Sequence, residues 1–256
     1  MSSPPLGPRI FAWAGAGLFA GSLLYFLFSY VVTFAEIAPR PIRADDVATN
    51  LGLFSVFAVH HSLFARERLR AFLARTLSPG LERSVYVWAA SLMLIAVCAW
   101  WRPLPGVAWQ VEGAAAWIFP VVQLAGAWLS VRSAAVIDIW DLAGTKQVSE
   151  GGPAASALRA TSLAGAERRR EGPHTEMEFK TDGPYGWVRH PIYLGWFLLV
   201  FSMATMTVTR LAFALISCAY VLVAIPLEER SLIRNSAGTY ADYMRKVPWK
   251  LVPHVY

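Results

Sequence analysis

Charged residues are scarce in this chain. Only 16% of its 256 residues are Asp, Glu, Lys or Arg, whereas 56% are hydrophobic, and the mean hydropathy is +0.43. A soluble domain of this size buries a core, but polar positions interrupt its apolar segments at short intervals. Here the apolar residues form long uninterrupted runs, which argues against a soluble globular fold and predicts membrane spans.

Cysteine is scarce as well, and the glycines form no nucleotide-binding loop. Cys98 and Cys218 both lie inside apolar runs, so they supply neither a disulfide framework nor a Cys-x-x-Cys zinc motif. We interpret both as small buried apolar residues. Gly15 and Gly17 lie within an apolar run instead of following a strand, which excludes a soluble dinucleotide-binding site.

Six apolar runs are long enough to be predicted as membrane-spanning helices. They cover residues 10–34, 47–65, 84–101, 113–139, 191–208 and 211–227. Several are close to the minimum length for an α-helix that crosses ~30 Å of hydrocarbon. The first run is too long for a signal-peptide core, so we expect it to be retained. The predicted fold class is all-α: a single polytopic transmembrane helical bundle over residues 1–256.

The basic residues predict the orientation of these spans. Both termini and the second and fourth loops together hold 18 Lys and Arg residues, against 4 on the opposite side. Because short loops rich in Lys and Arg stay in the cytosol, both termini are predicted to be cytosolic. In a bacterium the membrane would be the inner membrane. The net charge of +6 then has a topological cause, and no nucleic-acid partner is expected.

Two segments outside the spans have their own character. Residues 149–177 are rich in Gly, Ala, Pro and Ser, and are predicted to be a flexible cytosolic insertion that rests on anionic lipid headgroups. Residues 237–247 place Tyr240, Tyr243 and Val247 on one helical face. This spacing predicts a short amphipathic helix at the membrane interface.

Titratable residues gather at the predicted cytosolic ends of the spans. They are costly near a membrane interior, so each is a functional candidate. His61 ends the second span, Asp138 ends the fourth, His190 begins the fifth and Glu228 ends the sixth. Because the fifth and sixth spans are about equally long and joined by a tight turn, His190 and Glu228 are expected at the same depth. The other two residues reach that level from their own helices.

This polar layer suits a zwitterionic ligand that bears a cationic centre. Pro191 fits the first turn of a helix, and the amides after it carry the positive end of the helix dipole. Glu228 and Glu229 offer acceptors to ribose hydroxyls, an amine or a sulfonium. No metal site is expected, because no helix carries two ligands spaced i, i+3 or i, i+4.

Each of these features also has a structural alternative. His60 and His61 are compatible with buried or interfacial histidines, Asp138 with an ion pair to Arg132, and Glu228-Glu229-Arg230 with a solvated helix end. The residue types alone therefore leave the ligand open.

The C-terminal motif resembles that of a known superfamily. The motif consists of Gly183-Pro184-Tyr185, Val188-Arg189-His190-Pro191, Tyr193 and Gly195, followed further along by Glu228-Glu229. It resembles the signature of membrane methyltransferases, a superfamily that uses S-adenosylmethionine. Isoprenylcysteine carboxyl methyltransferases and phospholipid N-methyltransferases belong to it.

Upstream segments are similar to one branch of that superfamily, the methanethiol S-methyltransferases and nurim-type proteins. The similar segments are residues 61–66, 82–86, 101–105 and 137–148. Two features depart from the branch: Ile139-Trp140 stands where it usually has His-Phe, and the link between Val148 and Tyr185 is longer.

The resemblance implies S-adenosylmethionine as the methyl donor. It assigns donor binding to Tyr185, Arg189, His190, Tyr193, Leu194, Gly195, Glu228 and Glu229. The carboxylate of this donor suits the helix end, and its sulfonium suits the acidic pair.

The resulting hypothesis is methyl transfer to a small or membrane-dissolved thiol. A thiol with a pKa of ~8.5 is mostly protonated at neutral pH, so His61 is the candidate base, oriented by Asp138. Arg230 or Arg234 is the alternative, as a cation that stabilises the thiolate. A prenylcysteine carboxylate, an isoprenoid or a lipid amine stays open as the acceptor, as does a nurim-like membrane protein without turnover. Transport is disfavoured because the outer helix ends carry few polar residues.

Overall fold

The computed structural model describes residues 6–64, 81–149, 181–236 and 238–256. These residues form two compact units. The first contains residues 6–27, 55–64, 81–99 and 139–149; the second contains residues 28–54, 100–138, 181–236 and 238–256. The predicted insertion at residues 149–177 lies, from residue 150 onward, outside the described residues.

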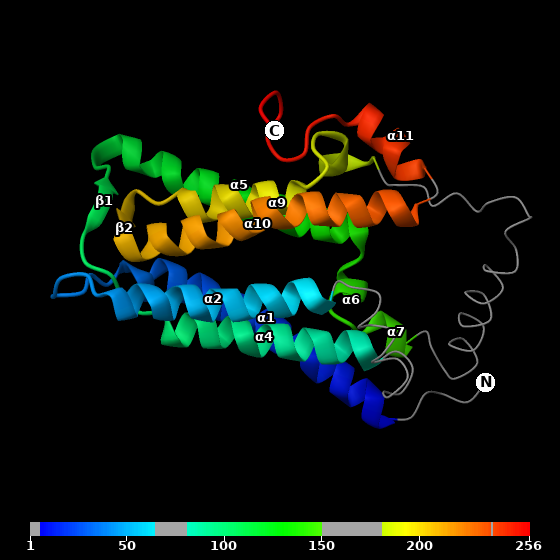
Figure 1. Ribbon diagram of the computed structural model, residues 1–256, viewed down its shortest axis with the longest axis horizontal. Coiled ribbons are helices and arrows are strands. Elements are labelled where there is room, and N and C mark those ends of the chain that lie inside the picture. Colours follow the sequence, from blue (N-terminus) through cyan, green and yellow to red (C-terminus); the bar gives the residue numbers. More distant parts are fainter. Residues whose placement is uncertain (1–5, 65–80, 150–180, 237) are drawn as a thin grey trace, which may run out of the picture. The chain divides into compact units, whose positions relative to one another are not determined.

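Helices dominate the described chain, which confirms the all-α membrane class. The α-helices are α1 (Leu6–Val31), α2 (Ala44–Phe64), α4 (Leu81–Trp100), α5 (Ile118–Ile137), α6 (Ile139–Leu142), α7 (Lys146–Ser149), α9 (Pro191–Phe201), α10 (Val208–Asn235) and α11 (Thr239–Lys246) (Figure 1). The 3-10 helices are η1 (Thr33–Ala35), η2 (Gly113–Trp117) and η3 (Gly183–Gly186). The strands β1 (Val107–Gln110) and β2 (Thr205–Thr207) pair antiparallel.

Within the described residues, four helical segments are long and apolar enough to cross a membrane. They are Leu6–Ala35, Leu81–Trp100, Gly113–Ile137 and Val208–Arg234. The second and fifth predicted spans are not among them. The helix α2 carries Asp45 and Asp46 in its first turn and His61 in its last, and α9 has only 11 residues. Six crossings therefore remain a prediction.

The fifth predicted span, residues 191–208, is wrong as a continuous helix. The helix α9 ends at Phe201, and the chain then extends into β2, where Thr207 pairs with Val107 of β1. The β-branched threonines of β2 favour an extended backbone over a helix. Because α10 has 28 residues and α9 has 11, the expectation that these two helices are equally long is also wrong.

Two glycines let α9 pack closely against α5. A Cβ atom at Gly195 would lie 2.6 Å from the carbonyl oxygen of Gly126, and one at Gly126 would lie 2.7 Å from that of Gly195. Ser130 of α5 donates a hydrogen bond to the carbonyl of Ile192 at 3.2 Å. Small residues allow this kind of backbone approach between membrane helices. The contact fixes the direction in which α9 presents its N-terminus.

A buried arginine closes the end of α1. The guanidinium of Arg210 donates to the carbonyls of Tyr30 at 2.9 Å, Thr205 at 2.6 Å and Val31, and only 4% of the residue is exposed. Tyr30 and Val31 form the last turn of α1, whose carbonyls have no partner within the helix. A cation is also favoured there by the helix dipole. Arg210, one of the 4 basic residues on the predicted outer side, thus has a structural role.

We predict that Arg210→Met destabilises the protein by about 2–4 kcal/mol, because the carbonyl of buried Tyr30 and two part-buried carbonyls lose a charged donor. The measurement is thermal unfolding of the purified protein in detergent. Arg43→Ala is the control, since Arg43 and Asp45 form an ion pair in which both side chains are more than half exposed. Equal melting temperatures for the two variants would contradict the capping role.

Candidate functional site

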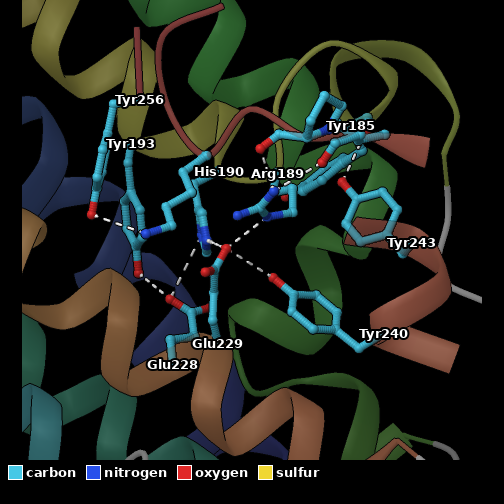
Figure 2. A network of polar contacts seen from close by, with 12 residues as sticks. Tyr185, Arg189, His190, Tyr193, Glu228, Glu229, Tyr240, Tyr243 and Tyr256 are labelled. Atoms are coloured by element: carbon cyan, nitrogen blue, oxygen red, sulfur yellow. Dashed lines mark hydrogen bonds and ion pairs between the residues drawn. The ribbon is translucent and has the colours of Figure 1, made fainter. Parts of the chain in front are cut away.

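A buried carboxylate lies at the centre of the C-terminal polar network. Oε1 of Glu229, on α10, accepts hydrogen bonds from Nε of Arg189 at 2.7 Å, Nε2 of His190 at 3.1 Å and the Tyr240 hydroxyl at 3.3 Å (Figure 2). An ionised carboxylate only accepts, so all three groups donate. The side chains of Arg189, His190 and Glu229 are at most 7% exposed. The paired charges make this burial tolerable.

The same arginine ties the C-terminal segment to the start of α9. Nη1 of Arg189 donates to the carbonyls of Val247 at 2.9 Å and Pro248 at 2.6 Å. The backbone N–H groups of Arg189 and His190 donate to the carbonyls of the next two residues, 249 and 250, both at 2.9 Å. The position of the segment after α11 therefore depends on Arg189 being held by Glu229.

The carboxylate of the neighbouring residue, Glu228, points away from the buried network and toward solvent. The side chain of Glu228 is 45% exposed, its Oε2 accepts from the Tyr193 hydroxyl at 2.9 Å, and Nδ1 of His190 lies 3.9 Å from it. The rings of His190 and Tyr193 stack with centroids 5.5 Å apart. Successive residues of an α-helix are ~100° apart, so two adjacent glutamates cannot share one direction. Of these two glutamates, Glu228 is the one whose carboxylate is open to a ligand.

The tyrosines around this network are hydrogen-bond donors. Tyr243 donates to the carbonyl of Tyr185 at 2.8 Å, which joins α11 to η3. Burial raises the pKa of Tyr243 to about 12, and burial also raises the pKa of Tyr240 and Tyr185. All three hydroxyls therefore stay protonated at neutral pH. The sequence placed Tyr240 and Tyr243 on one helical face, but their specific contacts were not predicted.

The first turn of α9 differs from the expectation of free amides. The N–H groups of Tyr193 and Leu194 both donate to the carbonyl of His190 at 3.1 Å. Pro191 has no N–H to offer. The amides of Tyr193 and Leu194 are therefore already hydrogen-bonded within the first turn. The expectation that they are free to bind an anion is wrong.

Two predicted donor-binding residues lie against neighbouring helices. Gly195 faces α5, where its missing Cβ permits the close packing described above. Leu194 is half-buried and packs against a hydrophobic cluster formed by Val221, Ile225 and Leu251. Their observed contacts support α9 in its place, and a direct role in donor binding remains a prediction.

The residues predicted to be catalytic lie in different parts of the chain and differ in their contacts and exposure. Asp138 caps α5 with a φ of 154°, a strained value for a residue with a side chain, and it is half-buried. Arg230 and Arg234 are exposed on α10. His61 belongs to the first unit, where its Nδ1 lies 2.7 Å from the hydroxyl of Tyr86. Sequence reasoning missed Tyr86 as a partner of His61.

Comparisons with known proteins extend well beyond this motif. The sequence pattern of the isoprenylcysteine carboxyl methyltransferase (ICMT) family matches residues 173–234. Methanethiol S-methyltransferase 2 of Bradyrhizobium diazoefficiens is 36% identical over 251 residues, which are 96% of this chain and 90% of that protein. The methanethiol S-methyltransferase of Mycobacterium tuberculosis is 34% identical, over 92% of this chain and 95% of that protein. The chain belongs to the methanethiol S-methyltransferase family.

Membership of this family confirms the resemblance found in the sequence and identifies the chain as a membrane methyltransferase. Human nurim is a more distant relative, 36% identical over 121 residues that cover 44% of this chain and 45% of nurim. No solved structure matches the chain significantly. Among the described residues, no three His, Cys, Asp or Glu side chains are grouped to hold a metal ion.

The two glutamates of the family motif give opposite predictions for stability. Glu229→Gln should lower the free energy of unfolding by about 3 kcal/mol or more, because Arg189 is left buried without its counter-charge. Glu228→Gln should change it by less than about 0.5 kcal/mol, because an exposed carboxylate is already solvated. Thermal unfolding without added ligand measures both. A destabilisation of Glu228→Gln equal to that of Glu229→Gln would contradict the distinction between them.

Proposed function

We propose that this methyltransferase moves the methyl group of S-adenosylmethionine to a small or membrane-dissolved thiol. The new bond joins the methyl carbon to the acceptor sulfur, the bond to the donor sulfur breaks, and the products are a thioether, S-adenosylhomocysteine and a proton. The observation that carries the proposal is the identity to methanethiol S-methyltransferases over nearly the whole chain. The match to human nurim, by comparison, covers 44% of the chain.

The groups around Glu228 suit the donor. Bound there, S-adenosylmethionine would supply an electrophilic methyl group on a sulfonium. The open carboxylate of Glu228 would face this positive charge or a ribose hydroxyl, with the Tyr193 hydroxyl and His190 ring beside it. Glu229 would not contact the donor but would hold Arg189 and His190 in position.

The carboxylate of the donor needs a cation, and Lys250 is our candidate. Arg189 is already engaged by Glu229 and by backbone carbonyls. Lys250 lies next to His190, because the carbonyl of Lys250 accepts a hydrogen bond from the backbone N–H of His190. Its Nζ contacts only the hydroxyl of Tyr256 at 3.4 Å and the ring at 4.5 Å among the interactions described. Such a cation–π contact is weak enough to exchange for a carboxylate.

The acceptor side of the proposal rests on the family motif. His61 is the group proposed to act on the thiol, with Asp138 as its support and Arg230 or Arg234 as the alternative cation. The excess of Lys and Arg in the predicted inner loops supports a donor site that faces the cytosol. The six apolar runs of the sequence support a chain that crosses the membrane six times. An apolar thiol would then enter from the lipid, and the polar donor from the cytosol.

The proposal predicts methyl transfer by the purified protein in detergent. With S-adenosylmethionine labelled in its methyl group, a panel of short-chain thiols should yield labelled thioethers and equal amounts of S-adenosylhomocysteine. A prenylcysteine, an isoprenoid and a phosphatidylethanolamine are included as competing acceptors. Transfer only to one of these would remove the thiol assignment, and the absence of any binding of S-adenosylmethionine would remove the donor.

Donor affinity provides a separate prediction for the site. Glu228→Gln should raise the dissociation constant of S-adenosylmethionine roughly tenfold, the effect of losing one charge-assisted contact. Lys250→Met should weaken S-adenosylmethionine to a similar extent but leave its decarboxylated analogue unaffected. Glu36→Gln, at an exposed position, is the control. Isothermal titration calorimetry measures all three, and an equal loss of both ligands in Lys250→Met would contradict the carboxylate contact.

A further inference from the structure

The first unit contains a polar cluster that the donor site does not use. The hydroxyl of Tyr86, on α4, lies 2.7 Å from Nδ1 of His61 near the end of α2. The ring of His60 stacks on the ring of Tyr86, with centroids 5.7 Å apart. The guanidinium of Arg83 lies 5.3 Å from the centre of the Tyr86 ring, and its Nε donates to the carbonyl of Asp141 at 3.2 Å. His60, Tyr86 and Arg83 are thus titratable or charged groups close to His61.

The chemistry of the two partners favours one direction for the hydrogen bond. A phenol is a better donor than the N–H of a neutral imidazole, and an imidazole nitrogen is a better acceptor than a phenol oxygen. Arg83 adds a positive charge near the Tyr86 ring, which strengthens its hydroxyl as a donor. Nδ1 of His61 then accepts this hydrogen bond. The single ring proton of a neutral His61 must lie on Nε2, because the hydrogen bond at one nitrogen decides the tautomer.

We propose that Tyr86 is a positioning residue that holds His61 as the Nε2–H tautomer, so that His61 donates a hydrogen bond to the acceptor sulfur and does not take its proton. This inference rests on the proposed transfer to a thiol. The thiol loses its proton to water before its sulfur is bound as a thiolate. The thiolate then attacks the methyl carbon, and the electron pair of the broken bond stays on the sulfur of S-adenosylhomocysteine. No proton moves in that step.

A hydrogen-bond donor at the sulfur increases the amount of bound thiolate but lowers the nucleophilicity of that thiolate. It accelerates the reaction only if the first effect is larger than the second. Each unit by which the hydrogen bond would lower the pKa of the bound thiol corresponds to up to tenfold tighter binding of the thiolate. The nucleophilicity of a thiolate falls less steeply with its pKa, with a Brønsted coefficient of ~0.4–0.5 in thiol exchange. The net gain is therefore roughly threefold per pKa unit as long as the thiol is mostly protonated.

Nitrogen NMR tests the tautomer without any turnover. The full-length protein is labelled with ¹⁵N-histidine, and the His61 signals are assigned by their loss in His61→Gln. We expect a protonated Nε2 and an unprotonated Nδ1, and a mixture of tautomers in Tyr86→Phe. A proton on Nδ1 in the unsubstituted protein would overturn the inference.

Substitution of His61 separates a donor from a base. The amide N–H of a glutamine reproduces the Nε2–H of histidine but cannot accept a proton. His61→Gln should therefore keep kcat/KM within roughly threefold, whereas His61→Ala should lose roughly tenfold, the net gain expected from a thiol pKa lowered by about two units. Equal losses in both variants would restore the base role. Tyr86→Phe should lower kcat/KM without changing the dissociation constant of S-adenosylmethionine, and Tyr25→Phe, on the exposed side of α1, is the control.

The pH dependence with different thiols gives the last test. If water takes the proton, the rising limb of kcat/KM must move with the pKa of each thiol used. A limb that stays at one pH for an acidic and a less acidic thiol of similar size would assign the proton to a group of the protein and overturn the inference. If no thiol is methylated at all, the proposed function fails instead, while the NMR result for His61 and Tyr86 still stands.

Discussion

The burial of Glu229 next to Arg189 is the interaction on which the C-terminal half of this methyltransferase depends. A carboxylate and a guanidinium removed from water lose several kcal/mol of hydration each, and their mutual attraction compensates only when the remaining donors and acceptors are also satisfied. Glu229 therefore accepts from His190 and Tyr240, and Arg189 donates to the carbonyls after α11. This requirement joins α9, α10 and α11 at one place and leaves Glu228 and Tyr193 together at its open side.

The helices α9 and α10, which position His190 and Glu228, differ in length. From Val208 to Glu228 the helix α10 rises about 30 Å, at 1.5 Å per residue. The return segment consists of α9, which rises only about 15 Å, an irregular stretch at residues 202–204 and the short strand β2. The strand pairing with β1 keeps β2 extended, and Gly126 and Gly195 lock α9 to α5. A short helix and a strand thus replace the long helix expected from hydropathy.

The sequence predicted the helical membrane class, because long apolar runs are a local pattern. Its Arg-His-Pro and Glu-Glu motifs singled out Arg189, His190 and Glu229 but not Tyr240. It predicted that His190 and Glu228 lie close together, although the argument from equal helices was wrong. It did not distinguish Glu228 from Glu229, since the difference arises from Arg189 and Tyr240, which arrive from other segments. The partner of His61 was missed for the same reason, because Tyr86 is remote in the sequence.

In the proposed arrangement, Glu229 holds Arg189 and His190 in place beneath the donor site, while Glu228 contacts the donor. A crystal structure of the full-length protein grown from a lipidic phase with S-adenosylhomocysteine would distinguish the two roles. We expect the ligand beside Glu228, Tyr193 and Lys250, with the Arg189–Glu229 pair intact. A ligand bound to the carboxylate of Glu229, with Arg189 displaced, or a ligand that contacts none of these residues, would contradict this arrangement.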